Sequence, residues 1–247
     1  MRYILLFSFF LFLSCNFSNK KLTSQQIVDA TMRVSGTNLL DNATISFYFR
    51  NKKYQSMRSK GKFSLDRTTI VDSVFITDVV SNNGFQRFVN NKKIKVLDSM
   101  AVQYASAVNS VHYFSVLPFG LNDNAVIKKR LPEVSINGKE YYKIEISFSK
   151  EDGGEDFEDV FIYWIDKKSF FIDYLAYAFH VNGGGVRFRE AKDQHMNKGI
   201  RFADYNNYKS SNKKPVLANL DKEYQEHSLV KVSEILLKDV QVQLNNN

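Results

Sequence analysis

The stretch Val160-Phe-Ile-Tyr-Trp-Ile-Asp-Lys-Lys-Ser-Phe-Phe-Ile-Asp-Tyr-Leu-Ala-Tyr-Ala-Phe179 decides the fold of this chain. Two runs rich in aromatic and β-branched residues flank a polar segment at 166–169, which is the pattern of two strands joined by a four-residue hairpin loop. Further turn signals at 182–185 and 197–199 divide the residues that follow into more strands. The stretch therefore predicts a mainly β protein built from antiparallel hairpins.

Counting outward from these turns pairs facing residues and assigns each side chain to a face of the sheet. The predicted pairs are Ile165 with Phe170, Val181 with Val186, His180 with Arg187, Ala178 with Arg189, and Ala176 with Ala191. One face then collects Phe161, Tyr163, Ile165, Ile172, Tyr174, Ala176, Ala178, His180, Arg187, Arg189, His195 and Phe202. The other collects Val160, Ile162, Trp164, Phe171, Leu175, Tyr177, Phe179 and Phe188. Because both faces are largely apolar, each needs a cover: helices for one, and a further layer, a partner or an apolar ligand for the other.

Two helices are expected in the rest of the chain. Residues 24–36 have an amphipathic pattern, with Thr23 or Ser24 as N-cap and Gly36 as the stop. Residues 98–111 are rich in alanine and place apolar side chains at helical spacing. Since no linker-like segment divides the sequence, we expect residues 24–247 to form a single β-rich domain.

Composition excludes several classes of protein. The chain has 247 residues, 14% of them aromatic, a formal net charge of +8 and one cysteine. A single thiol rules out an intramolecular disulfide, a cysteine-based zinc site and a Cys-x-x-Cys redox pair. The lysine pairs are dispersed among turns with no basic stripe or recognition motif, so no nucleic-acid partner is expected.

The N-terminus is typical of an exported protein. Arg2 precedes an apolar run over residues 3–13, which is too short to span a membrane durably and reads as a signal peptide. The run ends at Ser14 and Cys15, and a small residue directly before a cysteine resembles the lipobox of bacterial lipoproteins. We therefore expect a lipoprotein signal peptide at 1–14, lipidation of Cys15 and a tether at 15–23. The alternative is an ordinary signal peptide that leaves Cys15 as an incidental thiol.

The predicted face suggests a place for a ligand. His180, Arg187 and Arg189 would supply cationic donors at the edge of a low floor made by Ala176 and Ala178. Such a corner could bind an apolar molecule through its anionic head group. Tyr174 and Tyr163 lie on the same predicted face. In the alternative interpretation the arginines pair with Glu190, Asp193 or Asp204, and the site is only structural.

No motif for catalysis, a metal or a cofactor is present. The four histidines lack the spacing of a zinc hydrolase, and no nucleophile elbow, phosphate loop or dinucleotide fingerprint occurs. Six carboxylates at 151–159 could chelate calcium, but their spacing is not that of an EF-hand, and a solvated hairpin tip is the simpler interpretation. We therefore expect no cofactor, no metal site and no catalytic residue.

The order of parts, a lipobox, a short helix, a long meander interrupted by a helix, and the strand-turn at 163–169, resembles the LolA/LolB-like lipoprotein carriers. That resemblance implies an α+β fold in which a single curved antiparallel sheet, or half-barrel, wraps helices and encloses an apolar cavity. The segments 173–180, 182–191 and 199–208 are similar to a Bacteroidota lipoprotein family of unknown function. This second resemblance covers most of the mature chain and implies no known activity.

These features together predict an envelope lipoprotein. Its lipid would anchor it to the outer membrane facing the periplasm, because the residues after Cys15 lack the acidic signal of surface export. The concave face of the sheet would bind an apolar or amphiphilic ligand. The alternatives are a non-enzymatic accessory subunit of an outer-membrane complex and an enzyme acting on glycans or lipids.

Overall fold

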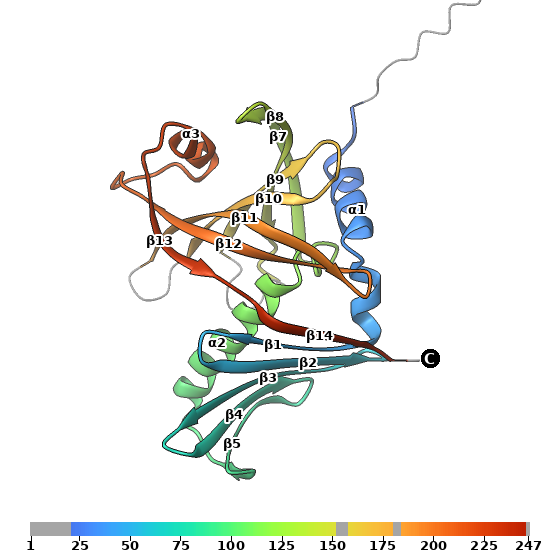
Figure 1. Cartoon of the computed structure of the whole chain (residues 1–247), viewed down its shortest axis with the longest axis vertical. Helices are drawn as coiled ribbons and strands as arrows, with labels where there is room; N and C mark the ends of the chain where they lie inside the picture. Colours follow the sequence, from blue (N-terminus) through green and yellow to red (C-terminus); the bar gives the residue numbers. More distant parts are fainter. Residues whose placement is uncertain (1–20, 152–157, 180–183, 246–247) are drawn as a thin grey trace, which may run out of the picture.

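A computed structural model describes residues 21–151, 158–179 and 184–245. Its strands form two seven-stranded antiparallel sheets, one below the other in Figure 1. Sheet A has the order β14 (Lys238–Leu244), β1 (Ala43–Phe49), β2 (Lys52–Ser59), β3 (Lys62–Val71), β4 (Val74–Ser81), β5 (Gly84–Val89) and β6 (Lys92–Ile94). Sheet B has the order β13 (Leu229–Ile235), β12 (Ile200–Ser210), β11 (Gly185–Asn197), β10 (Ile172–Phe179), β9 (Val160–Asp166), β8 (Lys139–Phe148) and β7 (Val126–Ile136). The prediction of a mainly β, antiparallel fold with a few helices is confirmed, but the strands form two open sheets rather than a single curved one.

Helices connect and cover the sheets. The N-terminal helix α1 (Ser24–Val34) is followed directly by a 3-10 helix η1 (Thr37–Asn42), and α2 (Asp98–Ser115) lies between β6 and β7 in the chain. A short 3-10 helix η3 (Leu217–Asn219) leads into α3 (Leu220–Gln225) near the C-terminus. Figure 1 shows α2 running beside sheet A and upward to sheet B, with α1 at the right of sheet B in this view.

The two predicted helices are confirmed, with one extension. Thr23 is the N-cap of α1, and its side chain and that of Gln26 form a capping box. The helix ends at Val34, and Gly36 follows with a φ of 68°. Helix α2 begins at Asp98 as expected but continues to Ser115 rather than ending at 111. The extra turn places Tyr113 and Phe114 on the helix.

The predicted register of sheet B is wrong from the first hairpin on, because Ile165 pairs with Ile172 rather than with Phe170. The predicted faces are wrong beyond that hairpin. The register shifts between Ile172 and Tyr174, so Tyr174 pairs with Trp164 while Leu175 pairs with Tyr163. The next hairpin is also offset, because Arg189 pairs with Leu175 rather than with Ala178. Since neighbouring positions of a strand point to opposite faces, Tyr163, Leu175 and Arg189 share one face, and Tyr174 lies on the other.

Both faces of sheet B are covered, as the sequence predicted. Ile27 and Val28 of α1 pack in the cluster that contains Tyr163 and Leu175. On the opposite face, Leu220 of α3 packs with Trp164, Tyr174 and Phe188. The segment 217–225 therefore supplies the second layer, and that face needs no ligand.

Candidate functional site

A large cleft lies between α2 and the two sheets, with a volume of about 1220 Å³. Sheet A contributes Phe49, Lys52 and Arg67, and helix α2 contributes its face from Val102 to Ser115. Sheet B contributes the end of the face that α1 leaves uncovered, through Phe161, Tyr177, Phe179, Arg187 and Arg189. The cleft is larger than the 300–1000 Å³ or so that is typical of sites for drug-sized ligands.

Aromatic rings form the wall where α2 meets sheet B. The ring centroids of Phe114 and Tyr177 lie 5.1 Å apart, and those of Phe161 and Tyr177 lie 5.7 Å apart. Tyr113 contacts both Phe114 and Phe161, at 5.4 and 5.9 Å. Such edge and offset contacts give a continuous apolar surface. The wall depends on the last turn of α2, which lies beyond residue 111, where the sequence predicted the helix to end.

Arg189 reaches into this wall. The residue is 8% exposed, and its guanidinium carbon lies 3.9 Å from the ring centroid of Phe114. Nη2 donates a hydrogen bond of 2.8 Å to the hydroxyl oxygen of Tyr177, while Nε is buried without a hydrogen-bond partner. Arg189 was predicted to lie at the edge of a floor made by Ala176 and Ala178. In the structure it lies inside the cleft instead.

The other cations of the cleft have different surroundings. Arg187 is half-buried, lies 5.0 Å from the ring centroid of Phe179 and donates to the main-chain oxygen of Val186. Arg67 is as buried as Arg189 but forms an ion pair of 2.6 Å with Asp78. Lys52 also lines the cleft, and burial lowers its pKa. Among the described lining residues, four are cationic and Asp159 is the one carboxylate.

The carboxylates proposed as structural partners of the arginines have other contacts. Glu190 accepts hydrogen bonds from Asn206, Tyr208 and Tyr224, at 3.0, 2.9 and 2.5 Å. Asp204 accepts one from the main-chain N–H of Leu237. Asp193 lies 4.0 Å from Lys192. The structural interpretation therefore fails for these three residues.

The remaining predicted site residues do not gather at the cleft. Tyr163 is fully buried beneath it, and its hydroxyl lies 3.1 Å from that of Tyr113. Burial raises the pKa of Tyr113 to about 12 and that of Tyr163 well above its usual value, so the pair stays neutral. Tyr174 is on the opposite face beneath α3. His180, Cys15 and most of the acidic run (152–157) lie outside the described residues.

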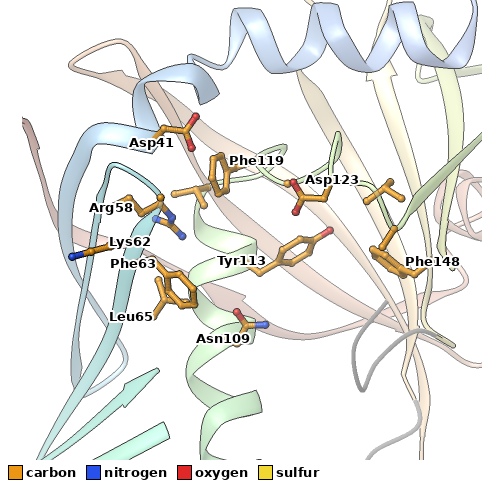
Figure 2. Close-up of a pocket in the computed structure, with 15 residues that line it drawn as sticks. Asp41, Arg58, Lys62, Phe63, Leu65, Asn109, Tyr113, Phe119, Asp123 and Phe148 are labelled. Carbon is orange, nitrogen blue, oxygen red and sulfur yellow. The ribbon is translucent and has the colours of Figure 1, made fainter. Parts of the chain in front are cut away.

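A smaller cleft of about 520 Å³ opens beside the C-terminal half of α2 (Figure 2). It shares Asn109, Tyr113 and Phe148 with the large cleft. Asp41 and Asp123 line it, and burial together with the charge of Asp41 raises the pKa of Asp123. Figure 2 shows these two carboxylates on either side of the Phe119 ring.

His112 on α2 has a structural role. It is 2% exposed, and its Nε2 lies 3.1 Å from the main-chain oxygen of Asp66. Burial lowers its pKa to about 4, so the ring is neutral at physiological pH. The imidazole ring of His112 packs against the rings of Phe47 and Tyr54 in sheet A. The contacts fix α2 on sheet A and so position one wall of the cleft.

Within the described ranges, no three His, Cys, Asp or Glu side chains are grouped as metal ligands. None of the helices in the same ranges has the length and apolar character needed to cross a bilayer.

A chain of two open antiparallel sheets with helices and a cleft between them matches known structures. A LolA-superfamily protein from Nitrosomonas europaea aligns with a TM-score of 0.52 and 10% identity, over 92% of this chain and 96% of that one. An outer membrane lipoprotein-sorting protein domain from Vibrio parahaemolyticus aligns with a TM-score of 0.43 and 10% identity, over 90% and 94%. The fold is LolA-like, as the first of these alignments shows.

The sequence also assigns the chain to a protein family. It belongs to a family of unknown function, DUF6503, whose model matches residues 1–236. None of the curated proteins with which the chain was compared matches it.

Proposed function

We propose that this protein is a lipid-anchored lipoprotein of the cell envelope that binds an apolar or amphiphilic ligand in the large cleft. The observation that supports this most is the cleft itself, about 1220 Å³ in volume and lined by aromatic rings and four cations. Aromatic walls favour an acyl chain, and arginines favour an anionic group on the same molecule. The LolA-like fold is consistent with a carrier of this kind.

A cleft-blocking variant tests the binding. Ala107 is exposed on α2 and lines the cleft, so Ala107→Trp fills part of it without disturbing the core. Met100 lies on the same helix, is 40% exposed and does not line the cleft, which makes Met100→Trp the matched control. Purified protein is stripped of lipid and titrated with a fluorescent fatty acid. We expect Ala107→Trp to bind more weakly by about tenfold or more, and Met100→Trp to bind like the wild type. Equal binding by both variants would contradict the proposal.

Anchoring is a separate part of the proposal. Residues 1–14 would be removed, Cys15 would be acylated, and residues up to 23 would tether the domain to the outer membrane, facing the periplasm. Several acyl chains together hold a protein on a bilayer stably. Cys15→Ser should abolish labelling by radioactive palmitate and move the protein from the membrane to the soluble fraction. A variant that stays in the membrane fraction would show that Cys15 is not the anchor.

A second candidate is an interaction subunit of an envelope complex. Ile70 and Phe75 are facing residues of the β3–β4 hairpin, and they are 59% and 51% exposed. Exposed apolar groups of this size often mark interaction surfaces. In this case crosslinking in cells yields one defined adduct that is lost in Ile70→Ser/Phe75→Ser, while that variant still binds the fluorescent fatty acid.

A further inference from the structure

Arg189 is a buried charge without a neutralising partner among the described residues. Buried charges in proteins are normally paired, because desolvating an isolated ion is costly. Arg67, on the other side of the same cleft, follows this rule through Asp78. No described carboxylate forms an ion pair with Arg189, and its exposed fraction is the same 8%. The difference points to a negative group that the described residues do not supply.

The contacts of Arg189 leave one buried nitrogen of the guanidinium without a hydrogen-bond partner among the described residues. Its face lies against Phe114, at 3.9 Å, and Nη2 donates to Tyr177. Nε has no hydrogen-bond partner. Nε–H lies on the edge that a carboxylate takes when it binds a guanidinium side-on with two hydrogen bonds. Arg189 is therefore held in place by two aromatic side chains with this donor unused.

The position of Arg189 sets the direction of a ligand. Arg189 pairs with Leu175 in the interior of sheet B, whereas Arg187 pairs with Tyr177 nearer the end of the strand and is only half-buried. An anionic group that reaches Arg189 lies inside the aromatic wall. A chain attached to it would then extend along the cleft past Phe161 and α2, which line the same space.

We propose that the ligand is an acyl chain ending in a single acid group, and that it binds with the acid group inward on Arg189. This inference rests on the proposed function and narrows it to one class of ligand and one orientation. Carboxylate and phosphate monoester share the required chemistry, and the experiment distinguishes them.

The test compares three single-chain ligands that differ only in the head group with one two-chain phospholipid. The full chain carrying Cys15→Ser is stripped of lipid and titrated with oleate, oleyl phosphate, oleyl alcohol and dioleoyl phosphatidylglycerol. We expect an acid to bind more tightly than the alcohol by roughly ten- to hundredfold, as for hydrogen bonds to charged groups. Preference for oleate over oleyl phosphate would assign a carboxylate, and the reverse a phosphate monoester. Tightest binding of the phospholipid would overturn the proposal, since it has two acyl chains and its phosphate is a diester rather than a terminal acid group.

Variants then assign the preference to Arg189. Arg189→Gln should lose most of the preference for acid over alcohol while retaining its affinity for the alcohol, which also shows that the cleft is still folded. Arg130→Gln is the matched control, because Arg130 is half-buried, pairs with Glu133 and lines neither cleft. The Nε–Hε signal of Arg189 in a ¹⁵N spectrum, assigned from its absence in Arg189→Gln, should shift with the acid and not with the alcohol.

The failures of the two proposals are distinguishable. If neither acid nor alcohol binds, the proposed function fails. If both bind equally, or Arg189→Gln weakens both equally, the cleft binds apolar chains but the acid group does not contact Arg189. If Arg187→Gln removes the acid preference and Arg189→Gln does not, the acid group lies at the end of the strand, and the inward orientation is wrong.

Discussion

Gly36 shows how one residue fixes the approach of two elements. Its φ is 68°, and a Cβ at this position would lie 1.8 Å from the carbonyl oxygen of Gly199, in the β11–β12 turn. That oxygen belongs to backbone and cannot move aside cheaply. We predict that Gly36→Ala lowers the free energy of unfolding by more than about 2 kcal/mol, because strain and a clash add. Urea unfolding followed by circular dichroism measures it.

Gly61 is the matched control for this prediction. Its φ of 76° is similar, but nothing lies within 4 Å of an added Cβ. Gly61→Ala should therefore cost only about 1 kcal/mol, the penalty of the left-handed backbone alone. If the two variants lose the same stability, the close approach of Gly36 to Gly199 is not what limits this site.

His112 predicts a pH dependence of stability. Its pKa is about 4 in the folded protein, against about 6.5 in the unfolded chain, so the unfolded state binds a proton first as the pH falls. Stability is therefore lost between pH 6.5 and pH 4, by up to about 3 kcal/mol from this group. Arg58 and the main-chain oxygen of Asp66 are the other groups that shift this pKa.

The His112 contribution is measured by difference, because carboxylates also titrate in this range. Unfolding free energies of the wild type and of His112→Gln are compared at pH 7, 5.5 and 4. The advantage of the wild type at pH 7 should shrink as the pH falls. Parallel pH curves would show that His112 is protonated equally in both states.

At the scale of elements, a buried ion pair joins α3 to sheet B. Lys143 of β8 and Asp221 of α3 are 2.9 Å apart, with side chains 7% and 2% exposed, and Lys143 also donates to the main-chain oxygen of Ala218. Removing one partner leaves an uncompensated charge, so Asp221→Ala should cost about 3 kcal/mol. Lys143→Met/Asp221→Leu should be close to the wild type in stability, which a double-mutant cycle by urea unfolding checks. If the double variant is as unstable as Asp221→Ala, the attraction between the two charges stabilises α3. The loss in Asp221→Ala would then not come only from leaving the buried Lys143 charge unpaired.

The sequence predicted elements well and their register poorly. Both helices, the hairpin turns and the apolar character of both faces of sheet B could be read from periodicity, capping and turn residues. The irregularity near Asp173 could not, because a one-residue shift leaves the alternating pattern intact while it exchanges the faces. Helix α3 was missed because six residues are too few to show a helical period.

The candidate site was predicted in part for the same reason. Arg187 and Arg189 do line a cleft together, but Tyr174 was assigned to their face from the wrong register. Tyr113 and Phe114 were overlooked as wall residues, although an unbroken helical pattern from 98 through 114 could have included them. Arg189 has no described carboxylate partner because Glu190 and Asp78 contact other residues. No local sequence pattern predicts the direction of those two side chains.

At the scale of the whole molecule, the two sheets are separate hydrogen-bonded units, and the cleft has walls on both. Phe49 belongs to sheet A, Tyr177 to sheet B, and α2 lies against each of them through His112 and Phe114. A ligand in the cleft would contact both sheets at once. Since it binds only the folded state, it should stabilise by about 2.7 kcal/mol at a concentration of one hundred times its Kd.

This stabilisation should reach both sheets together. We predict that saturating oleate raises the Tm by about 5 to 10 °C, given a shift of about 2 to 4 °C per kcal/mol for a chain of this size. Hydrogen exchange should show slower exchange in β1–β3 of sheet A as well as in β9–β11 of sheet B. The Ala107→Trp variant should show neither change, because its cleft is filled. Protection confined to sheet B would mean that the ligand contacts one wall only, and that the two sheets remain independent when it binds.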